Sequence, residues 1–131
     1  MEIRNRNLEI LIESLQLLAA DYKVQREVLP DHVHVPDEVA LIFGDSVVFI
    51  DDLANDRLVT PSQKTEVEKL DRLLEKMSNN KELWTPEALE QNPKWTSVRI
   101  QASNILNLFG KSKQRPNLFW LQYIQTNQGS E

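Results

Sequence analysis

The sequence predicts an all-α fold, a compact antiparallel bundle of about five to six helices. Apolar residues recur at intervals of three and four in three stretches, the spacing that places side chains on one face of an α-helix. Proline-containing helix starts separate the stretches, and the short connectors favour antiparallel packing around one core. The three stripes are Leu8, Leu11, Leu15, Leu18 and Tyr22; Val67, Leu70, Leu74 and Met77; and Trp95, Val98, Ala102, Ile105 and Phe109.

The first stripe predicts a helix over residues 8–22. The pattern continues or bends into a second piece over residues 21–29, which Asp21 could cap and which Pro30 ends. Residues 31–35 lie between two prolines and are expected to be extended, because the residue before a proline avoids the helical region. The outer face of the first helix is expected to carry Glu9, Glu13 and Gln16.

Residues 36–50 allow two interpretations. Pro36 suits the first turn of a helix, with two acidic residues behind it to oppose the helix dipole. Two apolar runs also flank Gly44-Asp45, a dipeptide suited to a two-residue hairpin turn. Neither run alternates apolar with polar residues, so we favour the helix, although Gly44 in its interior costs about 1 kcal/mol. The alternative is an α+β fold with a small hairpin at residues 39–50.

The clearest helix start is Thr60-Pro61-Ser62-Gln63. Thr60 can cap the helix, and Gln63 stands where a capping box requires it. The second apolar stripe follows, and Ser78-Asn79-Asn80 ends the helix. An exposed ladder of opposite charges four residues apart is expected from Lys64, Glu68 and Arg72.

Two further start signals, Thr85-Pro86 and Asn92-Pro93, predict a short helix and then a longer one. Gly110 is placed to end the longer helix in a left-handed conformation. We expect residues 110–116 to form a linker to a docked C-terminal segment, because residues 118–124 are too apolar to form a loose tail.

The composition is that of one packed domain. A chain of 131 residues has the usual size of a single domain, so residues 1–131 are interpreted as one helical unit with a frayed tail at 125–131. There is no cysteine, which excludes disulfides and thiolate metal sites. The amphipathic N-terminal stretch and the absence of a long apolar run argue against a signal peptide and a membrane span. We therefore expect a cytoplasmic protein with no membrane partner.

The charge is unevenly distributed along the chain. Residues 91–130 contain five basic residues and no acidic one, although the whole chain has a net charge of −5. The densest acidic stretch precedes residue 57, and an acidic surface of this kind attracts a basic partner. The predicted partner-binding residues are Asp37, Glu38, Asp45, Asp51, Asp52 and Asp56.

His32 and His34 are the two histidines of the chain, and they offer the alternative of a metal site or a metal-dependent enzyme. A His-x-His pair in an extended segment points both rings the same way, with acidic residues nearby. No cysteine or third histidine completes a familiar set of ligands. Three glycines cannot build a phosphate-binding loop, and no serine stands in a nucleophile elbow. We therefore predict no catalytic residue, no cofactor and no enzymatic activity.

The C-terminal region combines basic residues with aromatic ones, a mixture that could contact nucleic acid. An overall pI near 5.1 argues against this partner. The same segment suggests a structural or regulatory adaptor as a third alternative. The residues concerned are Lys111, Lys113, Arg115, Phe119, Trp120 and Tyr123.

The order of the segments resembles that of small acidic bacterial immunity-type proteins. The resemblance lies in the amphipathic first helix, the stretch 29–38, and the stretch 83–89 ahead of Trp95. It implies an inhibitor that covers a toxin, such as a basic nuclease, and it assigns no functional residue. We therefore expect a non-catalytic protein-binding module that meets its partner through an acidic face.

Overall fold

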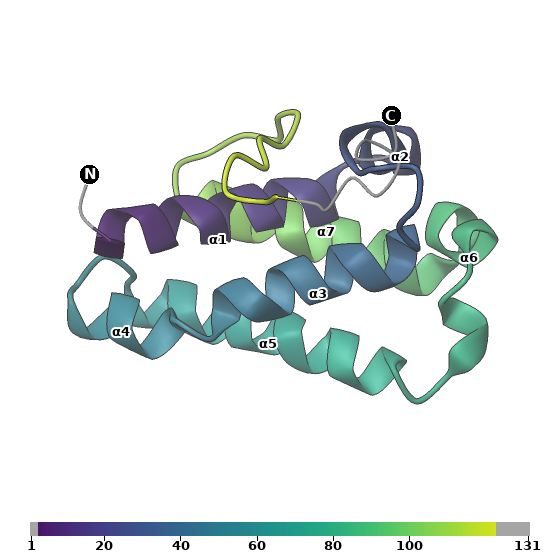
Figure 1. Ribbon diagram of the computed structural model, residues 1–131. Coiled ribbons are helices and arrows are strands. Elements are labelled where there is room, and N and C mark those ends of the chain that lie inside the picture. The colour runs from purple at the N-terminus through teal and green to yellow at the C-terminus, as the bar shows by residue number, and fades with distance from the viewer. Residues whose placement is uncertain (1–2, 123–131) are drawn as a thin grey trace, which may run out of the picture.

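The computed structural model describes residues 3–122. Within this range the chain forms seven α-helices and one 3-10 helix, and no strand (Figure 1). The four long helices are α1 (Ile3–Ala19), α3 (Val35–Val47), α5 (Pro61–Met77) and α7 (Pro93–Leu108). The predicted all-α bundle is confirmed. The hairpin alternative at residues 39–50 is wrong, because α3 continues through Gly44.

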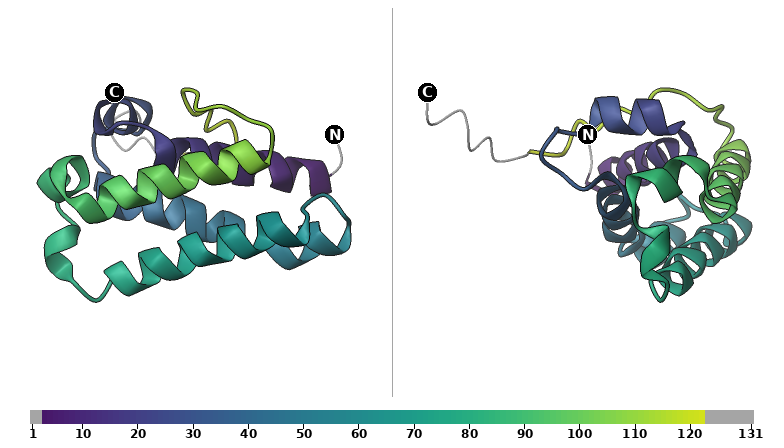
Figure 2. Two further views of the ribbon diagram at one scale, coloured as in Figure 1. Left: turned by 180° about the vertical axis from the view of Figure 1, so that it is seen from behind. Right: turned by 90° about the vertical axis from the view of Figure 1, so that its right-hand side faces the viewer.

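The long helices run up and down in alternation and form a ring (Figures 1 and 2). Both α1 and α5 pack against α3 and α7, so each long helix has two antiparallel neighbours. Short helices make the connections at the ends of the bundle. One end holds α2 (Tyr22–Val28), η1 (Lys81–Leu83) and α6 (Pro86–Gln91), and the other end holds α4 (Ile50–Asn55).

The helix count exceeds the prediction mainly because the chain turns between α3 and α4. The sequence pattern predicts one helix through residue 50, whereas α3 ends at Val47 and α4 begins at Ile50. The turn leaves Val48 and Phe49 exposed and keeps Ile50 in the core. It also directs α4 across the end of the bundle, where α4 contacts α1 and α5.

Local signals in the sequence set the helix ends as predicted. In α5, Gln63 N donates to Thr60 Oγ1 at 3.1 Å and Thr60 N donates to Gln63 Oε1 at 2.8 Å, which completes the capping box. Thr85 caps α6 by accepting from Ala88 N at 3.0 Å. Gly110 has a φ of 73°, the left-handed conformation expected after α7.

Asp21 departs from its predicted role. It precedes α2 at the cap position, but its side chain makes no capping hydrogen bond. Asp21 Oδ1 instead lies 3.1 Å from Lys113 Nζ, so the carboxylate holds the C-terminal segment. A capping role would need a carboxylate oxygen of Asp21 to accept from a backbone N–H in the first turn of α2.

The second half of α1 is buried on every side, and this contradicts the predicted exposure of Gln16. Residues 14–20 are all buried, including Gln16 at 3% exposure. Glu9 is exposed as predicted, and Glu13 is partly buried. Gln16 is covered because residues 111–122 return across α1.

Residues 111–122 are held against the bundle, and the stretch predicted as a linker belongs to this contact. Gln16 Nε2 donates to Ser112 O at 2.8 Å, and Gln16 Oε1 accepts from Gln114 N at 2.7 Å. Further along, Leu118, Trp120 and Leu121 pack against the core as the docking prediction requires. The remainder of the predicted segment, residues 123–131, lies outside the described residues.

Candidate partner-binding face

The six predicted partner-binding acids lie on α3 and α4. Five of them are exposed, and Glu38 is partly buried. Asp37 and Glu38 occupy the first turn of α3, where carboxylates oppose the positive end of the helix dipole. The remaining acids follow along the same part of the chain: Asp45 in α3, Asp51 and Asp52 in the first turn of α4, and Asp56 at its C-terminal end.

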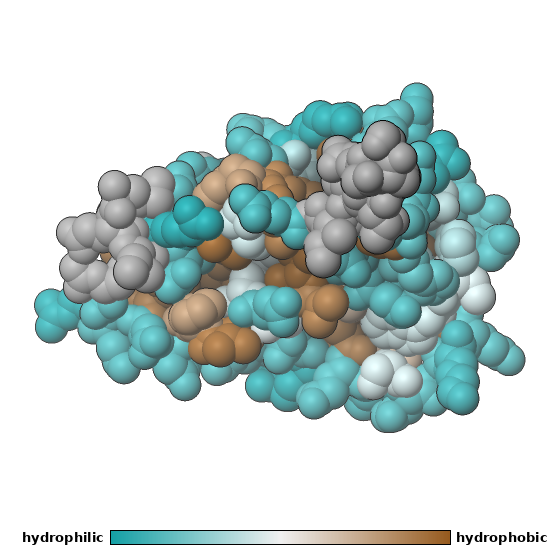
Figure 3. Space-filling model, in the orientation of Figure 1, coloured by the Kyte–Doolittle hydropathy of each residue, from teal (hydrophilic) through white to brown (hydrophobic). Residues whose placement is uncertain are grey.

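Large apolar side chains are exposed beside these acids. Leu41 is 56% exposed and Val48 is 73% exposed, and Phe49 follows at 39%. Leu41 lies four residues after Asp37 and four before Asp45, so the three share one face of α3. Figure 3 shows hydrophobic side chains at the surface over α3, bordered by hydrophilic ones. We call Asp37, Leu41, Asp45, Val48, Phe49 and Asp52 the α3 face.

A shallow groove of about 450 Å³ opens beside the start of this face. Its walls come from α3, from the C-terminal end of α5, and from the connection to α6. The lining residues are Asp37, Leu41, Ser78, Lys81 and Trp84. The groove is open to solvent, so a side chain can enter it from outside the bundle.

Trp84, which forms one wall of the groove, is held firmly in place. Its indole Nε1 donates to Met77 O at 2.9 Å, and its ring meets Trp95 edge-on at 5.2 Å between centroids. The Trp84 carbonyl oxygen lies 2.7 Å from His34 Nε2. The aromatic wall is therefore formed before any partner arrives, which limits the entropy lost on binding.

The acids on α3 and α4 are only partly paired with basic residues among the described residues. Asp51 pairs with Lys64 Nζ at 3.2 Å, and the same Nζ lies 3.7 Å from Glu68. The second of these pairs is the first of the two contacts predicted for the ladder of Lys64, Glu68 and Arg72. The hydrogen bond to Asp51, followed by the charge of Glu68, raises the pKa of Lys64. Within residues 3–122, Asp37, Asp45 and Asp52 make no ion pair, so the surface keeps a negative field there.

The histidines considered as metal ligands are exposed. His34 contacts the backbone oxygen of Trp84 and so helps to fix the wall of the groove. In the part of the chain that the structure describes, no three His, Asp or Glu residues are grouped so that they could hold a metal ion.

Two of the three basic residues of the C-terminal segment, Lys113 and Arg115, pair with acids of the bundle. Besides the Lys113–Asp21 pair, Arg115 Nη1 lies 3.2 Å from Glu27 Oε1. Phe119 and Trp120 meet edge-on at 5.2 Å, and Arg6 lies over the Phe119 ring at 5.7 Å. These cations and rings therefore contribute to holding the segment on α1 and α2. Tyr123, the third aromatic residue considered there, lies outside the described residues.

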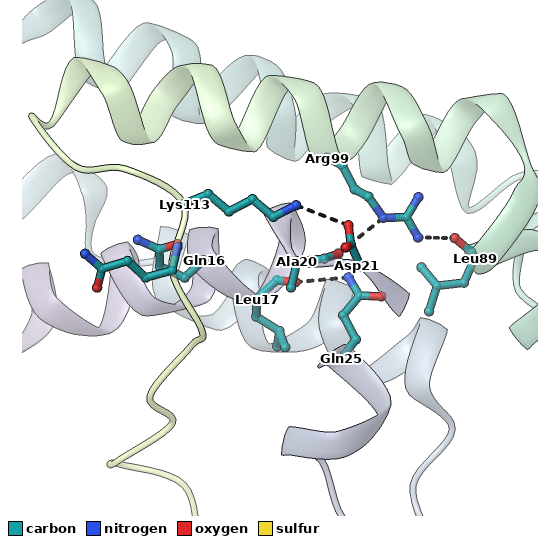
Figure 4. A network of polar contacts seen from close by, with 9 residues as sticks. Gln16, Leu17, Ala20, Asp21, Gln25, Leu89, Arg99 and Lys113 are labelled. Carbon is teal, nitrogen blue, oxygen red and sulfur yellow. Dashed lines mark hydrogen bonds and ion pairs between the residues drawn. The ribbon is translucent and has the colours of Figure 1, made fainter. Parts of the chain in front are cut away.

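Arg99 joins the ends of two helices near this segment (Figure 4). Its Nε donates to Ala20 O at 3.2 Å, and its Nη2 donates to Leu89 O at the end of α6. Burial lowers the pKa of Arg99, and the nearby charges of Asp21 and Glu90 oppose that shift. Because the donors are used on carbonyls at helix ends, Arg99 serves the fold.

Comparisons with protein-family models, curated proteins and solved structures give no significant match. Within residues 3–122, no helix combines the length and apolar character needed to cross a membrane.

Sequence reasoning found the acids of the α3 face but not its apolar residues. Leu41 and Val48 belong to the two apolar runs that flank Gly44-Asp45, for which the sequence predicts no exposed face. The signal was available, since Val39–Phe43 and Ser46–Ile50 hold more apolar residues than one helix face can bury. Which of them face outward depends on the neighbouring helices.

Proposed function

We propose that this chain is a non-catalytic protein-binding module that holds a basic protein partner through the α3 face. The observation that supports this most directly is the exposure of Leu41 in α3 and of Val48 at its C-terminal end, among carboxylates that make no ion pair within residues 3–122. Apolar residues exposed together within a polar rim are typical of protein interfaces. The surrounding acids would speed encounter with a partner of opposite charge and set its orientation.

An inhibitor of the immunity type fits this surface best. A nuclease must bind a polyanion, so its cleft is basic, and an acidic protein can occupy that cleft and exclude the substrate. The sequence resemblance to immunity-type proteins supports the same role. Asp37, Asp45 and Asp52 would supply the charge, and Leu41 and Val48 would supply the area that is desolvated on binding.

The test begins with the protein encoded beside this chain in its genome, and with basic proteins retained from a lysate of the same organism. Each candidate is purified and titrated against the chain by calorimetry. We expect binding that weakens by at least about tenfold between about 50 mM and about 500 mM salt. For a toxin, we expect one equivalent of the chain to abolish its activity.

Charge reversal locates the interface. The double variant Asp45→Lys, Asp52→Lys should weaken binding by about a hundredfold, since it places two cations against a basic partner. The matched control, Glu75→Lys with Glu87→Lys, makes the same change in net charge on exposed residues of α5 and α6. It should alter the affinity by no more than about threefold. Equal losses in the two variants, or no basic partner, would contradict the proposal.

A further inference from the structure

A row of residues along the exposed side of α3 has a gap in its middle, where a glycine stands between two large apolar residues. Leu41 and Gly44 lie in α3, and Val48 follows its last residue with a helical backbone. The three follow one another at steps of three and four residues, so they lie in one row along the helix. At a rise of about 1.5 Å per residue, Leu41 and Val48 are roughly 10 Å apart along the axis. Between these two exposed side chains, Gly44 offers no side chain at all. The surface there is a notch bounded by two apolar residues.

Nothing within the described chain requires glycine at this position. Gly44 lies in the interior of α3, and Gly110 is the glycine for which the described residues show a positive φ. A Cβ built on Gly44 would meet no atom within 4 Å. Alanine would therefore fit and would favour the helix. A glycine on a helix surface that serves neither turn nor packing leaves room for something that approaches from outside.

The shape of the row suits a second helix. Helices pack by placing side chains of one into the gaps between side chains of the other, and a small residue at the crossing point allows a close approach. The notch at Gly44 can take one such side chain between Leu41 and Val48. The groove at Trp84 lies at the N-terminal end of the same row, beside Leu41, and can take another.

The charges that flank the row define the partner's chemistry. Asp37 and Asp45 stand one turn before and one turn after Leu41, and Asp52 follows on α4. Lys81 is the basic residue in the groove wall, and Lys64 is engaged by Asp51 and Glu68. A helix laid along this row meets carboxylates on its flanks and apolar side chains at its centre.

We propose that the α3 face is the docking site for a basic amphipathic helix of the partner, which crosses α3 at Gly44. One apolar side chain of that helix enters the notch between Leu41 and Val48, and another enters the groove beside Trp84. Lysine or arginine residues on its flanks meet Asp37, Asp45 and Asp52. This inference rests on the proposed function and specifies the element through which the partner binds.

A synthetic peptide tests the docking mode without knowledge of the partner. The probe is an amidated helix of about eighteen residues, long enough to cover α3, with leucines on one face and lysines on its flanks. Titration into isotope-labelled protein should shift the amide signals of α3 and the indole signal of Trp84. A peptide of the same composition, scrambled so that the leucines do not share a face, should bind at least about tenfold more weakly.

Three variants separate helix docking from simple charge attraction. Leu41→Asp should weaken binding of the probe at least about tenfold, and Ile100→Asp is its matched control, since both side chains are 56% exposed. Gly44→Ala should raise the midpoint of thermal unfolding by about 3 °C and yet weaken binding about fivefold. Gly44→Leu fills the notch and should abolish binding.

The outcomes distinguish this inference from the broader proposal. Helix docking would be overturned if the scrambled peptide bound as well as the probe, or if neither peptide bound. It would also be overturned if Gly44→Ala and Gly44→Leu bound the probe as tightly as the wild type, or if the amide shifts centred outside α3. One outcome is that charge reversal at Asp45 and Asp52 abolishes binding of a natural partner that still binds the Gly44 and Leu41 variants normally. In that case helix docking is wrong, and the proposal of an acidic binding face is retained. If charge reversal has no effect on that partner, the proposed function fails as well.

Discussion

The hydroxyl oxygens of Ser14 and Ser46 lie 2.9 Å apart at the buried contact between α1 and α3. Each hydroxyl also lies within hydrogen-bond distance of a carbonyl in its own helix, Leu11 O at 2.8 Å and Phe43 O at 2.7 Å. Two hydroxyls carry two hydrogens, so two of these three hydrogen bonds can form at one time. The small side chains thus let α1 and α3 approach closely without leaving an oxygen unpaired.

This sharing predicts coupled mutations at the two serines. Ser46→Ala should lower the free energy of unfolding by about 1 kcal/mol, because it removes one buried hydrogen bond. Ser14→Ala should act similarly. In the double variant the free energy of unfolding should fall by about 0.5 kcal/mol less than the sum of the two single decreases. The reason is that each single variant already removes the contact between the two hydroxyls. Urea unfolding of the wild type, the two single variants and the double variant completes this double-mutant cycle. If the two single effects add strictly, the hydroxyls do not interact.

Gln16 should dominate the attachment of the C-terminal segment. It is buried and makes two hydrogen bonds to the backbone of that segment, whereas the Lys113–Asp21 pair is exposed. Gln16→Ala should lower the free energy of unfolding by about 2 kcal/mol, because backbone groups lose buried partners. Asp21→Asn should change it by less than about 1 kcal/mol.

Limited trypsin digestion tests the same contrast locally, because Lys111 and Lys113 lie within the attached segment and neither is followed by proline. Cleavage there should be faster in Gln16→Ala than in the wild type and nearly unchanged in Asp21→Asn. Faster cleavage in Asp21→Asn than in Gln16→Ala would instead assign the attachment to the ion pair.

Features of the fold that depend on near neighbours could be predicted from the sequence. The capping box joins Thr60 and Gln63, which are three positions apart, and the left-handed Gly110 directly follows the end of an apolar stripe. Gln16 could not be predicted, because its partners Ser112 and Gln114 are more than ninety residues away in the chain. The sequence pattern of a single helix predicts that a polar residue is exposed, because the pattern does not show which distant segment covers it.

The candidate site divides in the same way. Its acids could be predicted because charge clusters are visible in composition. The exposure of Leu41 and Val48 could not, because an apolar helix has no outer side until α1 and α5 occupy the inner one. The groove at Trp84 joins α3 to the end of α5, a juxtaposition that no single stretch of sequence contains.

Asp71 should make stability depend on pH. It is partly buried on α5, and burial, followed by the charge of Glu75, raises its pKa above 3.8. A group whose pKa is raised on folding favours the folded state below its unfolded pKa and loses that contribution as the pH rises. Asp71→Asn should therefore stabilise the protein at pH 7 by a few tenths of a kcal/mol, allowing for solvent screening.

The advantage of Asp71→Asn should disappear below about pH 3.8, where the wild-type carboxyl is protonated in both states. Urea unfolding at neutral and acidic pH measures it. In a Glu75→Gln background the advantage at pH 7 should shrink, because one cause of the shift is removed. An Asp71→Asn protein that is less stable than the wild type at pH 7 would contradict the assignment.

Gln25 provides the sharpest test of the buried polar contacts at the end of the bundle (Figure 4). It is fully buried, its Nε2 donates to Leu17 O at 3.0 Å, and its Oε1 has no hydrogen-bond partner within the described residues. Leu17 O also accepts from Ala20 N at 3.3 Å, so loss of the glutamine leaves this carbonyl with a donor.

Gln25→Leu should therefore change the free energy of unfolding by less than about 1 kcal/mol, because the lost hydrogen bond is offset by removal of an unpaired oxygen. Gln25→Glu keeps the shape but buries a carboxylate, and it should destabilise by about 3 kcal/mol at pH 7. Burial raises the pKa of such a carboxyl, so the loss should shrink as the pH falls toward about 4. Gln91→Glu, at an exposed position of α6, should have little effect at pH 7. Urea unfolding at both pH values decides the matter, since a Gln25→Leu protein as unstable as Gln25→Glu would mean that the amide itself is required.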